Sequence, residues 1–203
     1  MPDHPDHEDR CDIAAAGLLI TDSLTGQDFS VRDLAEEHAR VIQVTDARAA
    51  FCQLILTATG RLTWEYYPFT GRAADPAALT AITTTVLGCE PGPLPVPAWP
   101  GPTLLGTAGR MLRGLGLHTA LRNLGPDQDF CEIHAHLTIT RPAAPQHGHV
   151  ILSDDGMITW ECTLTQPGGL PPAAIASAIG RALSRLQYPG YPATAASPQL
   201  ATA

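Results

Sequence analysis

Two short stretches of this sequence predict its fold because they are nearly the same: GRLTWEYY at residues 60–67 and GMITWECT at residues 156–163. At an offset of 96 positions, Trp64 aligns with Trp160. In each stretch a glycine is followed by alternating apolar and polar residues, which is the pattern of a half-buried β-strand entered from a tight turn. A tryptophan is large enough to anchor a core, so we expect two equivalent strands that each bury their tryptophan.

The similarity extends to both sides of these strands at the same offset and without a gap. Three more pairs of segments match: EEHARV from residue 36 with EIHAHL from residue 132, LIL from residue 54 with VIL from residue 150, and PAAL from residue 76 with PAAI from residue 172. Chance similarity in an alanine-rich chain would not keep one order and one spacing over the whole series. The sequence therefore predicts a tandem duplication whose two copies are related by a pseudo-twofold axis.

Each copy has the sequence pattern of four strands between two helices. Alternation predicts matching strands in the two copies at 35–45 and 131–140, at 51–58 and 148–153, and at 61–67 and 157–164. An acidic cap before a proline predicts a helix that starts at Asp75 and Pro76. Helical spacing predicts another helix over 104–115, and residues 12–24 are expected to form a helix and then a strand. We expect an α+β fold: an α-β-β-β-β-α unit present twice, with antiparallel sheets and helices on one face.

Composition divides the chain into five parts. The expected parts are a flexible N-terminus at 1–10, a first α+β repeat at 11–88, a proline-rich linker at 89–102, a second α+β repeat at 103–186 and a disordered tail at 187–203. The prolines of the linker fix backbone angles and remove N–H donors, which predicts an extended, semi-rigid connection. The tail lacks any hydrophobic periodicity, which predicts disorder.

Charge and composition argue against several classes of partner. The net charge is −8 and no basic stripe is present, so we expect no nucleic-acid partner, since such partners are bound by neutralising phosphates. No apolar run approaches the ~20 residues that span a bilayer, so no membrane partner is expected. All 12 basic residues are arginine, which with abundant alanine, glycine and proline indicates a GC-rich bacterial genome. Five cysteines without a CxxC pair favour reduced thiols and a cytoplasmic location.

The polar face of the predicted sheets is the candidate working surface. Alternation directs the apolar residues of each strand toward the helices and directs glutamate and histidine to the opposite face. The candidate binding residues on that face are Glu36, His38, Arg40, Glu65, Glu132, His134, His136, His149 and Glu161. Ile42, Ile55 and Ile151 are expected on the same face, where they would add apolar surface.

Two kinds of small-ligand site are possible alternatives. His134 and His136 lie two apart on one predicted strand, and His149 on a neighbouring strand could complete a metal site. That arrangement would fit a metal-dependent enzyme or a metal-binding protein, whereas the simpler interpretation is that these histidines are solvated. A cleft for a small molecule at the junction of the two copies is the second alternative.

Motifs of the common enzyme classes are missing from the sequence. It contains no phosphate-binding glycine-rich loop, no GxSxG, no HExxH and no paired CxxC. We therefore expect no cofactor and no catalysis. The favoured hypothesis is a cytoplasmic protein that binds another protein, or itself sheet to sheet, as an adaptor, chaperone-like or regulatory molecule.

Overall fold

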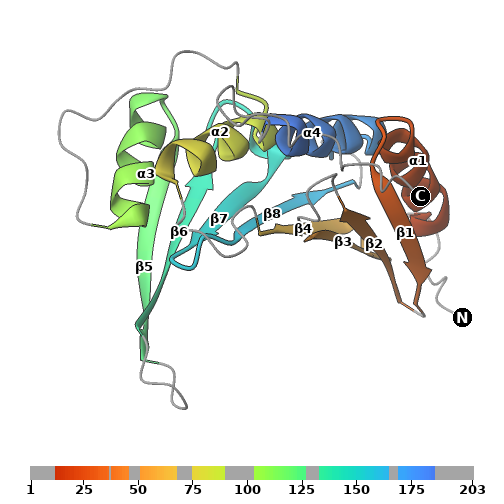
Figure 1. Ribbon diagram of the computed structural model, residues 1–203, viewed down its shortest axis with the longest axis horizontal. Helices are drawn as coiled ribbons and strands as arrows, with labels where there is room; N and C mark the ends of the chain where they lie inside the picture. Colours follow the sequence, from red (N-terminus) through yellow and green to blue (C-terminus); the bar gives the residue numbers. More distant parts are fainter. Residues whose placement is uncertain are drawn as a thin grey trace, which may run out of the picture.

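The computed structural model describes residues 12–36, 38–45, 51–67, 75–89, 103–126, 133–164 and 169–185. Within them, one antiparallel sheet of eight strands is covered by four α-helices on one face (Figure 1). The predicted α+β class with an antiparallel sheet is confirmed. The predicted N-terminal segment 1–10, the linker after Cys89 and the tail 187–203 lie outside the described residues.

The two halves of the chain contribute the same order of elements. The first half holds α1 (Ile13–Thr25), β1 (Ser30–Ala35), β2 (Ala39–Thr45), β3 (Phe51–Thr57), β4 (Arg61–Tyr66) and α2 (Pro76–Val86). The second holds α3 (Leu104–Gly114), β5 (His118–Pro126), β6 (Ile133–Thr140), the short 3-10 helix η1 (Pro145–His147), β7 (His149–Ser153), β8 (Ile158–Thr163) and α4 (Pro172–Arg185). The strand order is β1-β2-β3-β4-β8-β7-β6-β5, which reads as two mirrored sets of four strands.

The halves meet edge to edge at the centre of the sheet. Strands β4 and β8 pair antiparallel, with Trp64 directly opposite Trp160. The register is symmetric about this pair, because Thr63 lies opposite Glu161 and Glu65 lies opposite Thr159. The two halves therefore form one continuous sheet and do not stack face to face.

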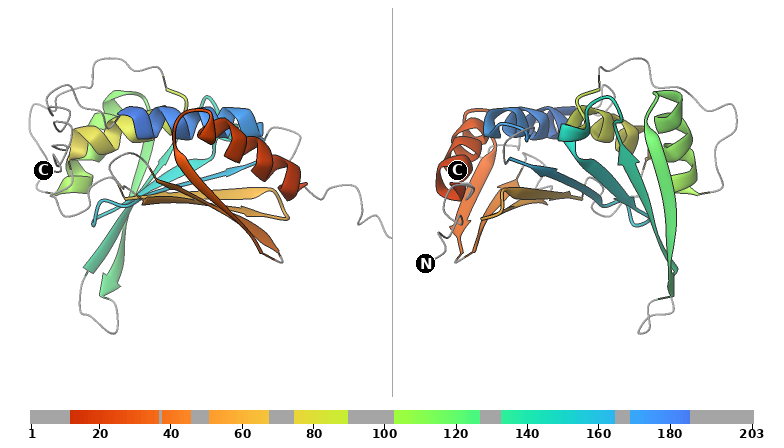
Figure 2. Two further views of the ribbon diagram at one scale, coloured as in Figure 1. Left: turned by 45° about the vertical axis from the view of Figure 1, so that its right-hand side comes forward. Right: turned by 180° about the vertical axis from the view of Figure 1, so that it is seen from behind.

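The sheet is curved like an arch, and the helices lie over its convex side (Figures 1 and 2). The principal helix–helix contacts join α1 to α4, α2 to α4 and α2 to α3. Each of these contacts brings together one helix from each half. The described helices leave the concave face of the sheet uncovered, and we call this concave surface the open face.

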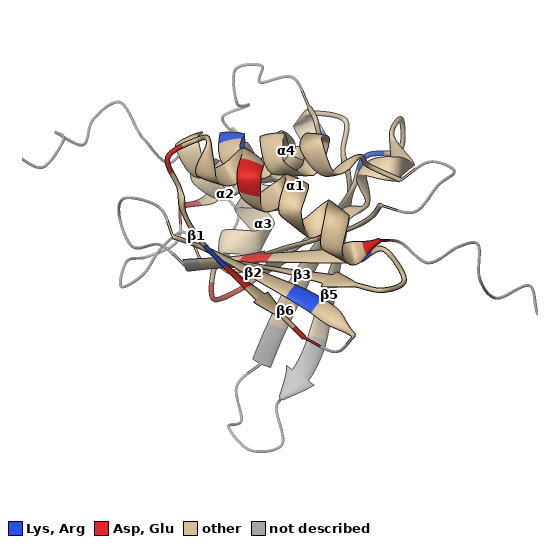
Figure 3. Ribbon diagram, turned by 90° about the vertical axis from the view of Figure 1, so that its right-hand side faces the viewer, with Lys and Arg blue, Asp and Glu red and all other residues tan. Residues whose placement is uncertain are grey.

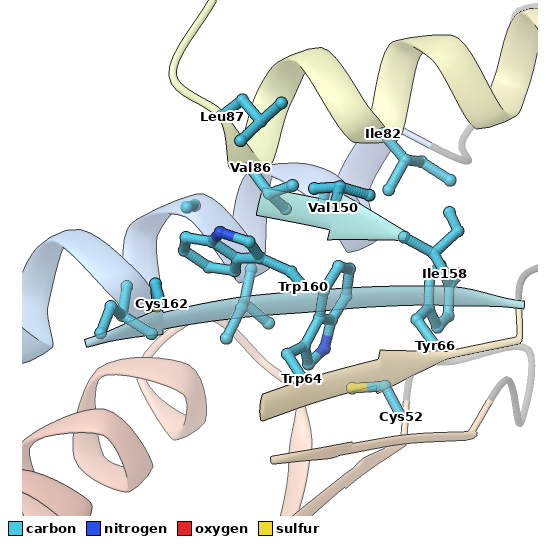
Figure 4. Packing of buried hydrophobic residues seen from close by; sticks show 14 of the residues in the cluster. Cys52, Trp64, Tyr66, Ile82, Val86, Leu87, Val150, Ile158, Trp160 and Cys162 are labelled. Carbon is cyan, nitrogen blue, oxygen red and sulfur yellow. The ribbon is translucent and has the colours of Figure 1, made fainter. Parts of the chain in front are cut away.

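The two tryptophans lie at the centre of the core beneath the helices (Figure 4). Neither exposes any of its surface, which confirms that both are buried. Their rings pack edge to face with centroids 6.5 Å apart, and Trp64 also stacks on Tyr66 at 5.4 Å. Such offset and edge-on arrangements are the ones that aromatic pairs favour.

Local sequence signals account for the turns and helix starts. Gly60 and Gly156 have φ of 75° and 89°, which side-chain-bearing residues rarely adopt, so each allows the predicted hairpin turn. The Asp75 carboxylate accepts a hydrogen bond of 2.9 Å from the N–H of Ala77 and caps α2 as predicted. Thr103 caps α3 in the same way.

Two predicted elements differ from the structure. The single strand expected at 35–45 is the end of β1, a turn and then β2. The helix-then-strand expected at 12–24 is wholly helical, and β1 begins only at Ser30. This segment is helical for two reasons. The Asp12 carboxylate caps the helix by accepting hydrogen bonds from the N–H groups of Ala14 and Ala15. Ile20 and Leu24 lie on one buried face of the helix.

Candidate functional site

Four residues of β4 and β8 form the centre of the open face. In β4, half-buried Thr63 and Glu65 alternate with fully buried side chains. In β8, Glu161 is half-buried, whereas Thr159 is only 8% exposed although its place in the strand directs it to the same face. The register places Glu65 and Glu161 on a diagonal, which in an antiparallel pair separates Cβ atoms by about 7–8 Å. Both glutamates therefore lie on the open face as predicted, at the middle of the sheet.

Glu161 has an arginine and a histidine as neighbours. Its Oε2 lies 2.6 Å from Nη2 of Arg61 and 3.4 Å from Nε2 of His149. The Arg61 side chain is 58% exposed, so this pair adds little to stability and serves mainly to orient the carboxylate. Glu161 and His149, which were both predicted to belong to the surface, are thus brought together.

Glu65 lies in an acidic environment. No ion-pair partner of Glu65 is found among the described residues. The pKa of the exposed Tyr67 hydroxyl is raised by partial burial and further by the negative charges of Asp155 and Glu65. This side of the open face therefore carries uncompensated negative charge.

Apolar residues flank the central glutamates. Ile55 of β3 pairs with Thr63, and Ile151 of β7 pairs with Thr159. Both isoleucines are half-buried on the face that the described helices leave bare. The open face therefore offers apolar contact area on each side of a polar centre, in agreement with the predicted placement of these two residues.

Arg40 is a correction to the predicted surface, because its side chain lies on the helix side of the sheet. Its guanidinium forms a salt bridge with Asp33 of β1 and donates a hydrogen bond of 2.8 Å to the carbonyl of Ala14 in α1. Figure 3 faces this end of the sheet and shows basic and acidic positions close together. The hydrogen bonds from Arg40 lower the pKa of Asp33, and Asp33 in turn raises the pKa of Arg40.

The reason for this error is a shift of one residue between the matching strands of the two halves. Ile42 pairs with Leu54 and is fully buried, whereas Ile139 occupies the matching place opposite Val150. The offset is therefore 97 at β2 and β6, although it is 96 at β4 and β8. A one-residue slip turns every side chain of a strand to the other face, so Ile42 also lies in the core and not on the open face.

The remaining predicted residues are more scattered. Glu36 and His38 are exposed at the β1–β2 turn, where the Glu36 N–H donates a hydrogen bond of 2.9 Å to the carbonyl of Ala39. His136 lies in β6 opposite Ser153. Glu132 is outside the described residues, and His134 is described only through its backbone, opposite Gly125.

The alternative metal site does not form between His136 and His149. His149 pairs with Thr140, four residues along β6 from His136, and this separates the two histidines by about 13 Å along the strand. Ligand nitrogens must lie roughly 2 Å from one ion, and side chains that stand upright on a sheet do not converge over that span. Within the described residues, no group of three metal-binding side chains has suitable spacing.

A hollow on the helix side is lined by residues that the sequence did not single out. It has a volume of about 300 Å³ and lies where α2 and η1 meet α4. His147 and Arg181 contribute its basic groups, although they are 34 positions apart in the sequence. Neither residue belongs to a recognisable motif, and only the position of the loop before β7 beside α2 brings them together.

Comparison of the chain with family models, curated proteins and solved structures gave no match. Of the helices that the structure describes, none has both the length and the apolar character needed to cross a bilayer.

Proposed function

We propose that this protein binds another protein through the open face of its sheet, as a non-catalytic adaptor, chaperone-like or regulatory molecule. The observation that carries this proposal is the width of the uncovered surface, which extends over eight strands while the described helices lie on the other side. Isolated exposed apolar residues are ordinary, but a broad partly apolar surface with a polar centre is typical of an interaction site.

The chemistry of the open face indicates what the partner would present. Ile55 and Ile151 favour apolar side chains on the partner, and Glu65 favours a basic one beside them. Glu161 is already engaged by Arg61 and His149, so it contributes hydrogen-bond acceptors and little net charge. A folded or extended segment that carries apolar residues next to arginine or lysine would match this pattern.

The buried thiols support a binding role over a cysteine-based reaction. Cys162 lies in β8 on the core side, and burial raises its pKa to about 12. A thiol with such a pKa remains protonated at neutral pH and is a poor nucleophile. Cys52 is also fully buried, and both side chains serve as small apolar core residues.

The proposal includes an origin and a location for the protein. A tandem duplication would account for the shared order of elements and for the symmetric register around Trp64 and Trp160. The arginine-only basic composition supports a bacterial source. The thiols of Cys89 and Cys162, which form no disulfide within the described residues, support a reducing cytoplasm.

Affinity purification with a matched pair of double variants tests the binding role. Ile55→Arg/Ile151→Arg places two charges on the open face, whereas Leu18→Arg/Leu19→Arg places two charges on the exposed side of α1. We expect one partner, identified by mass spectrometry, to be recovered with the wild-type protein and with the α1 variant. The open-face variant should lose it, and purified components should reproduce the difference.

Two outcomes contradict the proposal. Repeated recovery of no specific partner by the wild-type protein would argue against a protein-binding role. Equal recovery by the two double variants, with unchanged thermal unfolding of both, would show that the open face is not the binding surface.

A further inference from the structure

The hollow between the two halves of the helix layer has the form of a small-molecule site. We call it the α2–α4 pocket, and it is lined by Thr85, Val86, Gly88, His147, Leu170, Ala174, Ser177, Ala178 and Arg181. Most of the lining surface is apolar, and Thr85, His147, Ser177 and Arg181 provide the polar side chains. Concave sites of this volume and composition are the usual setting for small ligands.

Several contacts hold the wall of the pocket that His147 forms. The indole N–H of Trp160 donates a hydrogen bond of 2.7 Å to the carbonyl of His147, which ties the wall to the centre of the core. On the other side, a Cβ on Gly88 would lie 2.6 Å from Cε1 of His147, so only glycine permits this close approach. Gly88 also has φ of 64°, a conformation that favours glycine.

Arg141 is committed to the end of α2 and is not available to a ligand. Its Nη1 donates to the carbonyl of Leu87 at 3.1 Å and also to the carbonyl of Gly88. These groups follow the C-terminus of α2, where a cation is favoured by the helix dipole. Burial lowers the pKa of His147, and the nearby positive charge of Arg141 lowers it further, although a backbone hydrogen bond with Val86 opposes this.

Arg181 is the charged group that a ligand could meet. It follows Ser177 by four residues and Ala174 by seven, so these side chains share one face of α4. No salt bridge of Arg181 is found among the described residues. Its guanidinium is a fixed fork of donors that fits a carboxylate with two parallel hydrogen bonds.

From this arrangement we infer that the α2–α4 pocket binds a small monocarboxylate with an apolar chain. The carboxylate would pair with Arg181, and the chain would lie against Val86, Leu170 and Ala178. One available cation matches a single negative charge, and the same cation disfavours an amine. A volume of about 300 Å³ lies at the lower end of the range for small-ligand sites, so we expect a ligand of roughly ten non-hydrogen atoms.

The pocket lies at the junction of the halves. Val86 and Gly88 end the first half, whereas His147, Leu170 and Arg181 belong to the second. This site is independent of the open face, which lies on the other side of the sheet. Failure of the protein-binding proposal therefore leaves this inference unaffected, and the reverse also holds.

Titration of the full-length protein with octanoate tests the inference. Octanoate has ten non-hydrogen atoms, and octan-1-ol and octylamine provide neutral and cationic probes of nearly the same shape. Calorimetry should show saturable binding of octanoate to one site, with weaker binding of both other probes. Arg181→Gln should weaken octanoate binding about tenfold or more, as expected for loss of a charged hydrogen-bonded pair.

Two further variants complete the test. Arg32→Gln removes the same charge from an exposed position on β1 and should leave octanoate binding unchanged. Ser177→Leu fills the pocket without removing a charge and should abolish binding, while the thermal unfolding midpoint stays close to that of the wild type. Absence of saturable octanoate binding to the wild type overturns the inference. Equal loss in the Arg181 and Arg32 variants, or equal affinity for octanoate and octan-1-ol, overturns it as well.

Discussion

The two central tryptophans differ in the hydrogen bonding of their indole N–H groups. Trp160 donates to the carbonyl of His147, whereas Nε1 of Trp64 is buried without a partner among the described residues. A buried polar group without a hydrogen bond costs about 1–3 kcal/mol. The two tryptophans are therefore equally buried, but only Trp64 carries the free-energy cost of an unsatisfied N–H group.

This difference predicts unequal effects of the same substitution. Trp160→Phe removes a hydrogen bond and leaves the carbonyl of His147 without its donor, whereas Trp64→Phe removes an unsatisfied N–H. Both variants lose a similar aromatic volume. We expect Trp160→Phe to lower the free energy of unfolding by about 1–2 kcal/mol more than Trp64→Phe does, as measured by urea titration. Equal losses would show that the two N–H groups are satisfied to the same degree.

At this scale the sequence predicted burial better than it predicted polar contacts. Alternation placed both tryptophans, Glu65, Glu161 and His149 correctly, because period-two patterning alone assigns a residue to a face. It could not place Arg40, since the sequence match to the second half hid a slip of one residue. The pairing of Glu161 with Arg61 depends on strand order, which no local pattern contains.

Among the elements, α1, β1 and β2 are joined by one arginine. Arg40 of β2 binds Asp33 of β1 and the Ala14 carbonyl of α1, and the side chains of Arg40 and Asp33 are only 14% and 19% exposed. Gly17 allows this contact, because a Cβ there would overlap the Arg40 side chain. The first helix is therefore held to the edge of the sheet through a largely buried ion pair.

The lowered pKa of Asp33 predicts how stability changes in acid. Because the folded-state pKa lies below the ordinary value of 3.8, this carboxylate stabilises the fold fully above that value and loses its contribution as the pH falls through the folded pKa. Urea titrations from pH 6 down to pH 2.5 should show a smaller acid-dependent loss for Asp33→Asn than for the wild type.

Asp22→Asn provides the control, because Asp22 is an exposed aspartate on α1. Its acid-dependent loss should equal that of the wild type. If Asp33→Asn also kept the full loss, Arg40 would not be the partner that favours the charged form of Asp33.

Most element boundaries followed from caps, turns and alternation. The start of α2 and the turns at Gly60 and Gly156 depend on single residues with well-defined backbone roles, so they could be predicted. Helical spacing predicted α3, but its Thr103 cap was not predicted. The β1–β2 turn could not be predicted, because it contains neither glycine nor proline to mark it. The lining residues of the pocket could not be predicted either, since its walls come from elements that are neighbours only after the sheet has formed.

In the whole molecule, the two halves share one hydrophobic core and one helix layer. A single cluster of buried residues includes side chains of both halves, and the principal helix contacts also cross between them. Separated from its neighbour, β4 would expose a row of backbone donors and acceptors beside an apolar surface. We therefore expect the halves to depend on each other for folding.

Separate expression of residues 12–89 and 103–185 tests this dependence. Each fragment alone should be unfolded or self-associated, because its central strand lacks a partner. An equimolar mixture should yield a one-to-one complex in sedimentation velocity runs. Two stable monomers that do not associate when mixed would show that each half is an independent domain.

The edge-on contact of the two indoles also makes the junction observable without a label. Because the rings belong to different halves and their centroids lie 6.5 Å apart, their electronic transitions are coupled only while β4 and β8 remain paired. Near-ultraviolet circular dichroism would therefore report separation of the halves in real time, even if every helix stayed intact.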